Sequence, residues 1–260
     1  MPYNRAMDCE IMASRALQGV FRSLRLYHGP DAPKAAMDAL YRQFVEPGDL
    51  VFDIGAHVGD RVSSFRRLGA RVIAVEPQPP LVSALRHIHG RDPLVEIVAR
   101  AAGSRAETLA LHVNTENPTV STISDAFLHD ARDARGWEGQ SWDARIDVDV
   151  VTLDALIARY GVPAFIKIDV EGFEDAALRG LSEPVRALSF EFTTIARDVT
   201  MACLDRLSLL GGYRYNFALG ENQILTFDRW LLVEEIADHP SNLPHSSNSD
   251  DVYAELRGRR

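Results

Sequence analysis

The chain has 260 residues, a formal net charge of −9, and 46% hydrophobic and 25% charged residues, a balance typical of a globular protein built on one domain with additions. Phosphate backbones repel an acidic chain, so we expect no extended nucleic-acid interface. The two cysteines exclude a disulfide framework and a CxxC zinc site, and no apolar run has the length of a membrane span, so we expect a cytoplasmic protein.

Residues 1–48 predict an N-terminal helical extension. One helix is expected over residues 6–26. A second one carries Pro33 in its first turn and ends before Pro47. Because this segment precedes the regular pattern that follows, we treat it as separate from the main domain, and we expect it to help shape a ligand pocket.

Alternating strands and helices begin at residue 49. Short apolar runs at 50–54, 71–75 and 94–98 are typical of strands covered on both faces, and helices are expected between them at 58–68 and 80–89. Further strands are expected at 108–113, 147–151, 164–169, 187–192 and 224–227, and further helices at 153–160, 174–181 and 198–210. This order predicts an α/β, Rossmann-like domain over residues 49–237, with a central, mostly parallel sheet flanked by helices.

Two segments do not fit this alternation. Residues 114–145 are polar, rich in turn formers, and carry Trp137 and Trp142 among charges. A segment of this length is either a lid or substrate loop or a plain surface insertion. Residues 238–260 begin with a stretch rich in Ser, Asn, Asp and Pro, which predicts a flexible C-terminal tail.

The turn after the first core strand is the most informative segment. It reads DIGAHVGD over residues 53–60, and ligands of parallel sheets bind at this place. Gly55 allows a sharp turn, and Gly59 allows close approach at the helix start. The spacing is GxxxG, whereas pyrophosphate-binding loops have GxGxxG. Asp53 and Asp60 would repel a pyrophosphate but suit a ligand with a cationic amino group, such as the methionine part of S-adenosylmethionine.

A second acidic signal follows at the end of the next strand. Glu76 lies where a carboxylate can accept hydrogen bonds from both hydroxyls of a ribose. The glycine loop and this carboxylate each occur often for structural reasons. Together, in register with one βαβ unit, they predict a site for a nucleotide-type ligand.

Two runs resemble a known family. Residues 51–59 (VFDIGAHVG), followed by VEP at 75–77, are similar to the opening of class I methyltransferases. Residues 166–174 (IKIDVEGFE) resemble the FkbM family, which mostly methylates hydroxyl oxygens of natural products, sugars and related molecules. The likeness covers about residues 45–230. It departs from the family at His57, where asparagine is usual.

The resemblance implies that S-adenosylmethionine is the cofactor, with adenine near Ala101 and Ala102. The residues expected around it are Asp53, Gly55, Ala56, His57, Gly59, Asp60, Glu76, Pro77, Ala101, Ala102 and Asp169. The acceptor would be a small molecule or a glycan.

Three carboxylates are candidates for the chemistry. Asp169 ends the strand at 164–169, Glu171 follows it, and Glu191 lies near the end of the strand at 187–192. Each could act as the base that takes the acceptor proton, and Asp169 with Glu171 could orient the acceptor or hold a divalent cation. Alternatively, Asp169 caps the next helix and Glu171 is solvated. A cation is possible here, but we predict no metal ligands.

Two other residues of these runs also have alternative roles. Lys167 lies within an apolar strand, so it needs a buried partner, for which Asp169 and Glu191 are the candidates. His57 is either a base or a hydrogen-bonded loop residue.

Two other functions compete with methyl transfer. An NAD-dependent oxidoreductase would need the GxGxxG spacing that the chain lacks. A non-catalytic nucleotide-binding module would keep the fold without turnover. The absence of a D/N-P-P-Y/F run, which is frequent in methyltransferases acting on bases or amide nitrogens, favours oxygen as the acceptor atom. The sequence does not identify the acceptor or the oligomeric state.

Overall fold

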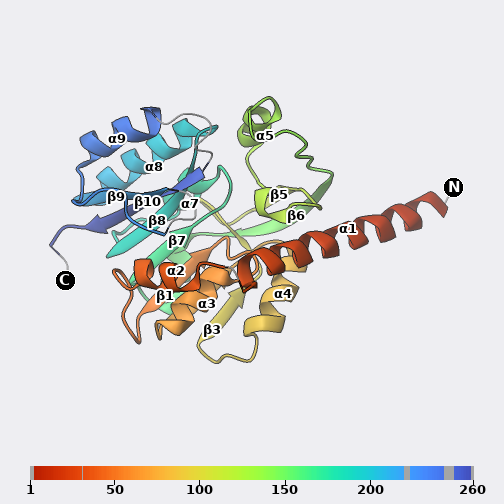
Figure 1. Cartoon of the computed structure of the whole chain (residues 1–260), viewed down its shortest axis with the longest axis horizontal. Coiled ribbons are helices and arrows are strands. Elements are labelled where there is room, and N and C mark those ends of the chain that lie inside the picture. The colour runs from red at the N-terminus through yellow and green to blue at the C-terminus, as the bar shows by residue number, and fades with distance from the viewer. Residues whose placement is uncertain (1–2, 31, 220–222, 243–248, 259–260) are drawn as a thin grey trace.

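The computed structural model describes residues 3–30, 32–219, 223–242 and 249–258 (Figure 1). Its elements, in chain order, are α1 (Tyr3–His28), α2 (Lys34–Tyr41), β1 (Leu50–Ile54), α3 (Asp60–Arg67), β2 (Arg71–Val75), α4 (Pro79–His89), β3 (Val95–Val98), β4 (Ala101–Ala102), β5 (Thr108–Val113), the 3-10 turn η1 (Pro118–Val120), α5 (Asp125–Arg132), β6 (Ala144–Val151), α6 (Leu153–Tyr160), β7 (Phe165–Ile168), α7 (Glu174–Arg179), β8 (Ala187–Thr193), α8 (Arg197–Leu210), β9 (Tyr213–Leu219), α9 (Val233–Asn242) and β10 (Ser249–Leu256).

A seven-stranded sheet in the order β3-β2-β1-β7-β8-β10-β9 forms the centre of the molecule. β1 pairs in parallel with β2 and β7, and β10 alone runs antiparallel to its neighbours β8 and β9. Helices cover both faces, with α2 and α3 on one side and α8 and α9 on the other (Figure 1). The expected α/β, Rossmann-like class with a mostly parallel sheet is therefore confirmed.

The apolar runs form central strands because both faces of the sheet are buried. Successive side chains of a strand point to opposite faces. In β1, Val51 packs into the cluster beneath α2 and α3, whereas Phe52 packs into the cluster that includes α6, α7 and α8 residues. Both side chains are fully buried. This two-sided burial fixes the strand ends, and hence the loops that follow them.

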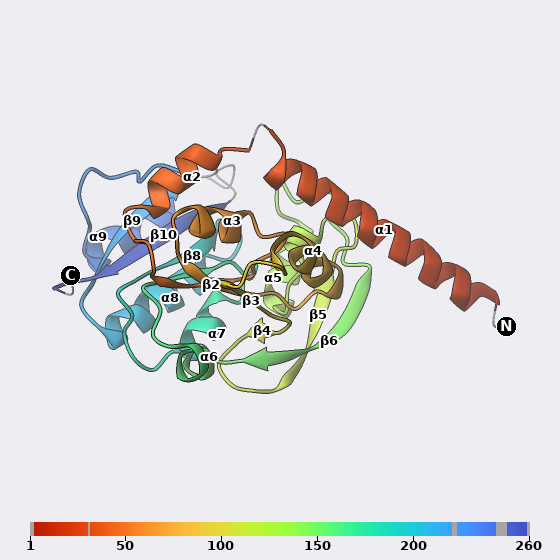
Figure 2. The ribbon, with the colours of Figure 1, turned by 90° about the horizontal axis from the view of Figure 1, so that it is seen from below.

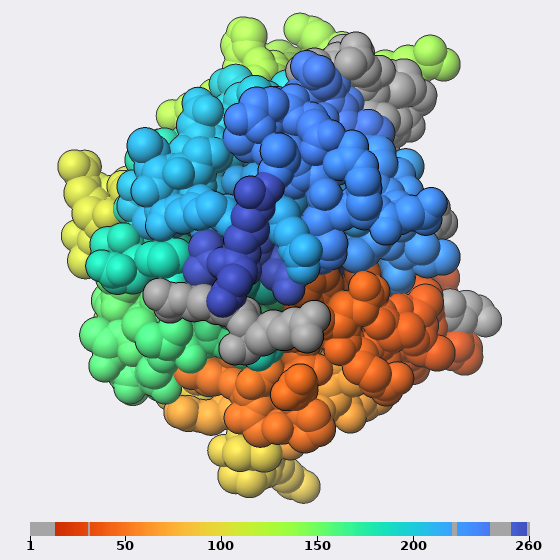
Figure 3. Space-filling model, turned by 90° about the vertical axis from the view of Figure 1, so that its left-hand side faces the viewer, coloured from red at the N-terminus to blue at the C-terminus, as the bar shows by residue number. Residues whose placement is uncertain are grey.

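The C-terminal region is not the flexible tail that its composition predicts. Residues 249–256 form β10, which inserts between β8 and β9, and Val252, Tyr253 and Ala254 are fully buried. In Figure 3 the dark-blue C-terminal residues lie against the body of the molecule. The prediction is wrong because β10 forms backbone hydrogen bonds with a strand on each side, and the polar composition of this segment does not indicate such pairing. Part of the predicted tail, residues 243–248 and 259–260, lies outside the described residues.

The last parallel strand also differs from its predicted place. The sequence indicates 224–227, but β9 covers Tyr213–Leu219, and Ile224 is exposed. Leu225 makes only an isolated bridge to Ala218. The sequence pattern does not predict β9 because Arg214 and Asn216 interrupt its apolar run. In the structure Asn216 is buried, and its side chain forms hydrogen bonds with the backbone of Phe227.

Residues 114–145 fold into an ordered unit beside the small sheet β4-β6-β5. They contain η1 and α5, and Phe127 packs edge-on against Trp137 at 5.1 Å between ring centroids. The Trp142 indole donates to the carbonyl of Val120 at 2.8 Å. A separate small core therefore holds this segment in shape.

The N-terminal helix packs on the same unit. α1 is long and projects from the body (Figures 1 and 2). Its Gly19 lies so close to the backbone of Thr115 and to Pro118 that a Cβ atom would not fit. His28 lies 2.9 Å from the carbonyl of Val58 in the loop after β1. Within the described residues, no helix combines the length and hydropathy of a membrane span.

Candidate active site

One cavity of about 280 Å³ lies at the carboxyl ends of the central parallel strands. It brings together residues that the sequence places far apart. The predicted site residues that line it are Asp53, Gly55, Ala56, His57, Asp60, Glu76, Pro77, Ala101, Ala102, Asp169, Glu171 and Glu191.

The two loop glycines have different structural roles. Gly55 has φ of +81°, and a methyl group on it would overlap the carbonyl oxygen of Asp169, so only glycine fits between the two loops. Gly59 does not line the cavity. Its Cβ would lie 2.7 Å from Leu85 and 2.9 Å from His89, so it serves the close packing of α3 on α4.

The two aspartates of the loop differ in their partners. Asp53 is 1% exposed, and its Oδ2 has no hydrogen-bond partner in the described structure. Burial, followed by the charge of Asp60, raises the pKa of Asp53 to about 7. Burial would also raise the pKa of Asp60, but the adjacent Arg61 holds it below its ordinary value. Asp53 therefore lines the cavity and keeps one buried oxygen that lacks a donor.

Glu76 is fixed by the backbone of two loops. Its Oε2 accepts from the His57 N–H at 3.0 Å, and its Oε1 accepts from the Gln78 N–H at 2.9 Å. Burial raises the pKa of Glu76 to about 8, although these two bonds oppose the shift. Each oxygen keeps a second lone pair, so the carboxylate can still accept from a ligand.

His57 is held as a neutral loop residue. Its ring packs edge-on against Tyr27 of α1 at 5.4 Å, and burial lowers its pKa to about 4. Thr119 Oγ1 lies 3.4 Å from Nε2. A ring with this pKa is a weak base, so the structure favours the hydrogen-bonded role over the catalytic one. Tyr27, which lines the cavity, gave no sequence signal.

Lys167 is buried beneath the carboxylates. Its Nζ donates to Asp169 Oδ2 at 3.1 Å and to Asp251 Oδ1 at 3.0 Å. Burial opposes the charge, but the two carboxylates raise the pKa of Lys167 above its ordinary value. One of the expected partners, Asp169, is found. The other partner is Asp251 of β10, rather than Glu191. Asp251 is not among the expected partners, because it lies in the segment predicted to be a flexible tail.

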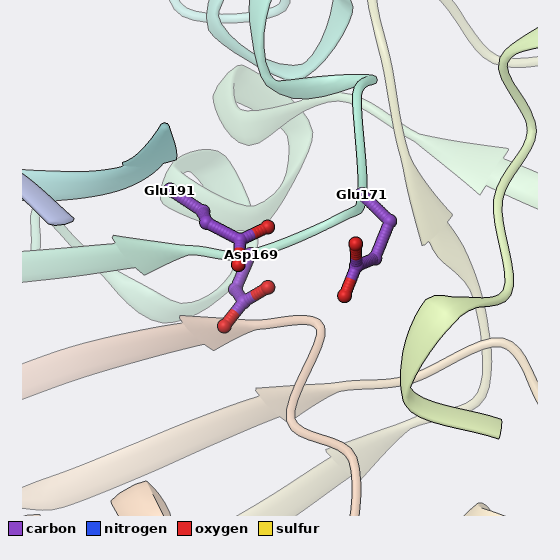
Figure 4. A group of neighbouring side chains, drawn as sticks. All are labelled: Asp169, Glu171 and Glu191. Carbon is purple, nitrogen blue, oxygen red and sulfur yellow. The ribbon is translucent and has the colours of Figure 1, made fainter. Parts of the chain in front are cut away.

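Within the described part of the chain, the carboxylates of Glu171 and Glu191 lack hydrogen-bond donors that would offset their burial. Burial and the nearby Asp169 raise the pKa of both carboxyls. No hydrogen bond to either carboxylate is found among the described residues, and Glu191 Oε2 is buried without a partner. One oxygen from each of Asp169, Glu171 and Glu191 lies within 4.8 Å of the other two (Figure 4).

The loop that carries Asp169 and Glu171 is shaped by another glutamate. Glu174 accepts from the backbone N–H groups of Val170 and Gly172, both at 3.0 Å. Glu171 has φ of +54°, in the left-handed region. The alternative in which Asp169 caps α7 is not observed, because Phe173 occupies the N-cap position, no side chain caps the helix, and Asp169 lines the cavity. Glu171 is not solvated, since it is 6% exposed.

The insertion 114–145 closes part of the cavity. Thr119, Val120, Ser121 and Trp137 line it. Ser121 donates to Gln78 Oε1 at 3.2 Å, which ties the insertion to the loop after β2. The alternative of a plain surface insertion is therefore not supported.

A Rossmann-like sheet with one antiparallel strand next to its edge, and an acidic cavity at its carboxyl edge, defines the class I methyltransferase architecture. The chain belongs to the FkbM methyltransferase family, because the methyltransferase FkbM domain matches residues 53–217, more than half of the chain. No curated protein matches the chain.

Solved structures with a similar arrangement share little sequence. A TehB-like SAM-dependent methyltransferase from Corynebacterium glutamicum is 12% identical, with a TM-score of 0.45 and coverage of 91% of this chain and 94% of that one. A precorrin-6Y C5,15-methyltransferase from Geobacter metallireducens is 12% identical, with a TM-score of 0.44 and coverage of 86% and 87%. Aeropyrum pernix fibrillarin, solved with bound S-adenosyl-L-methionine, is 10% identical, with a TM-score of 0.41 and coverage of 85% and 73%. The family assignment does not depend on these similarities.

Proposed function

We propose that the protein transfers a methyl group from S-adenosylmethionine to a hydroxyl oxygen of a small molecule, a sugar or a natural product. One observation carries this proposal. A single cavity is lined both by Asp53 and Glu76 and by the cluster of three carboxylates Asp169, Glu171 and Glu191. Membership of a methyltransferase family favours this function over an NAD-dependent oxidoreductase.

We assign the part of the cavity around Asp53 and Glu76 to the cofactor. Asp53 has an oxygen without a donor, which fits the ammonium of a methionine group. Glu76 has free lone pairs for the ribose hydroxyls. The small, buried Ala101 and Ala102 leave an apolar surface for adenine. Gly55 and Ala56 supply the turn between these groups.

We assign the part of the cavity around the three carboxylates to the acceptor, and we call it the acceptor end. Trp137 and Phe173 offer aromatic surface, and Asp169, Glu171 and Glu191 offer oxygens that accept from hydroxyl groups. We assign the insertion 114–145 as a lid over this end. Carboxylates here repel phosphate-rich acceptors, which favours a neutral or cationic molecule over a nucleic acid. A cytoplasmic location stays a prediction.

The chemistry needs alignment and one proton acceptor. The sulfonium already activates the methyl carbon, so the chain has to place the acceptor oxygen in line with it. In this proposal Asp169, held by Lys167, orients the hydroxyl, and Glu191 takes its proton as the carbon–oxygen bond forms.

A binding measurement tests the cofactor. Calorimetric titration should show that S-adenosylmethionine binds with a Kd of about 1–100 μM, and that NAD does not bind. A preference for NAD would contradict the proposal, as would the absence of binding by S-adenosylmethionine.

We expect cofactor affinity to rise with pH. Asp53 and Glu76 have raised pKa values, of about 7 and about 8, and must be ionised to pair with the ammonium and to accept from the ribose. Binding favours the deprotonated forms, so affinity should increase by about fivefold or more from pH 6 to pH 7.5. This range lies below the pKa of an α-amino group. Calorimetry at several pH values measures the slope.

Asp53→Asn is the control for this slope. The amide has no charge to lose, so its weaker binding should depend less on pH than that of the wild type. If both proteins show the same slope, Asp53 does not meet the ammonium.

Replacing the assigned base should affect turnover more than binding. For Glu191→Gln we expect kcat to fall by about 10²–10⁴-fold, with little change in cofactor affinity, because the amide cannot take the proton. Formation of S-adenosylhomocysteine with an acceptor found by screening measures kcat. Glu183→Gln, the same change at an exposed residue, should leave kcat unchanged. Full turnover by Glu191→Gln would show that another group is the base.

A further inference from the structure

We propose that Asp169, Glu171 and Glu191 bind one divalent cation, such as Mg²⁺, Ca²⁺ or Mn²⁺, at the acceptor end of the cavity. The inference rests on the proposed function for the role of the ion, but not for its binding. Three observations support it: the spacing of the oxygens, the lack of other partners, and the balance of charge.

The spacing fits an ion coordinated by oxygen. One oxygen of each carboxylate lies within 4.8 Å of the other two. Two oxygens on opposite sides of a Ca²⁺ ion are about 4.6–5.2 Å apart, since each lies about 2.3–2.6 Å from the metal. Mg²⁺ and Mn²⁺ need the oxygens slightly closer. The three side chains come from β8 and from the loop after β7, and Figure 4 shows their carboxylates converging.

Two of the three carboxylates, those of Glu171 and Glu191, accept no hydrogen bond from the part of the chain that the structure describes. Glu171 is 6% exposed and makes no side-chain hydrogen bond among the described residues, although its carboxylate turns toward Asp169 (Figure 4). Glu191 Oε2 is buried, also without a partner. A buried carboxylate without a donor costs several kcal/mol unless a cation or a proton neutralises it. The nearby Glu174 differs, because two backbone amides hold it.

The charges around the cluster leave room for a divalent ion. Lys167 contacts Asp169 but is already balanced by Asp251, and Arg61 is paired with Asp60. Arg100 also lines the cavity, but it is exposed to solvent. S-Adenosylmethionine brings a single net positive charge, which Asp53 alone offsets. Asp169, Glu171 and Glu191 therefore face the cavity with more negative charge than the cofactor and the chain compensate.

A cation here would help the transfer. The ion would supply Lewis acidity, which would make the proton of a neighbouring acceptor hydroxyl easier to remove. A carboxylate that binds through one oxygen keeps the other, so the free oxygen of Glu191 can take the proton. The methyl carbon then bonds to the acceptor oxygen, and S-adenosylhomocysteine leaves.

Titration of the full chain with Mn²⁺ alone tests the site, with electron paramagnetic resonance reporting the free ion. We expect one ion per chain. Glu171→Gln and Glu191→Gln should each raise the Kd by about tenfold or more, on the scale known for changes around metal sites. Asp205→Asn, at an exposed position on α8, should not change it. Circular dichroism verifies that each variant is folded. If Glu171→Gln does not fold, the Mn²⁺ affinity of Glu191→Gln alone tests the site.

Two results would overturn the cation site. One is the absence of Mn²⁺ binding at millimolar concentration, and the other is equal affinity in the wild type and both glutamine variants. A cofactor titration on the same preparation keeps the two proposals apart. A preparation that binds S-adenosylmethionine but fails to bind Mn²⁺ overturns only the cation site. A preparation that binds Mn²⁺ but fails to bind S-adenosylmethionine overturns only the cofactor assignment.

Discussion

Lys167→Met should lower the free energy of unfolding by about 3 kcal/mol at pH 7, since it strands two carboxylates that now share one ammonium. Nζ lies 3.1 Å from Asp169 and 3.0 Å from Asp251, and the lysine is fully buried. Methionine fills the same volume without the charge. Such a loss is a large part of the stability of a typical domain. Urea denaturation measures it.

A second substitution identifies the cause of this loss. Without the ammonium, Asp169 and Asp251 lose the cation that both now contact. Adding Asp251→Asn removes one of the two uncompensated charges, so the double variant should recover part of the stability that Lys167→Met loses. A double variant that is no more stable than Lys167→Met would point to lost packing instead.

Gly55→Ala should abolish cofactor binding and lower the free energy of unfolding by more than about 3 kcal/mol. Two causes combine. Gly55 has φ of +81°, which disfavours any L-residue, and its new methyl group would overlap the carbonyl oxygen of Asp169. Either the loop after β1 or the loop after β7 must move, and both line the cavity. Urea denaturation and calorimetric titration with S-adenosylmethionine measure the two effects.

Gly139→Ala separates these causes. Gly139 has φ of +80°, but nothing lies within 4 Å of its Cβ position. This variant should therefore lose only the backbone contribution, about 1–2 kcal/mol, and should bind the cofactor as the wild type does. Equal losses in the two variants would mean that the close approach to Asp169 is unimportant.

Much of the site is encoded locally. The run 53–60 follows one apolar strand, and Glu76 ends the next, so strand periodicity and glycine spacing suffice to place both at the same sheet edge. Asp169 and Glu191 follow from the same reasoning. Each of these residues lies at or near the end of a strand whose apolar run marks it in the sequence.

The sequence by itself therefore determined the α/β class, the loop after β1 and the carboxylates at the strand ends. Only the tertiary structure placed Asp251, 84 residues after Lys167, at the cavity. Its strand, β10, is stabilised by pairing with β8 and β9, and such pairing depends on distant segments rather than on local composition. The same holds for Tyr27 and Trp137, which reach the cavity through the packing of α1 and the insertion.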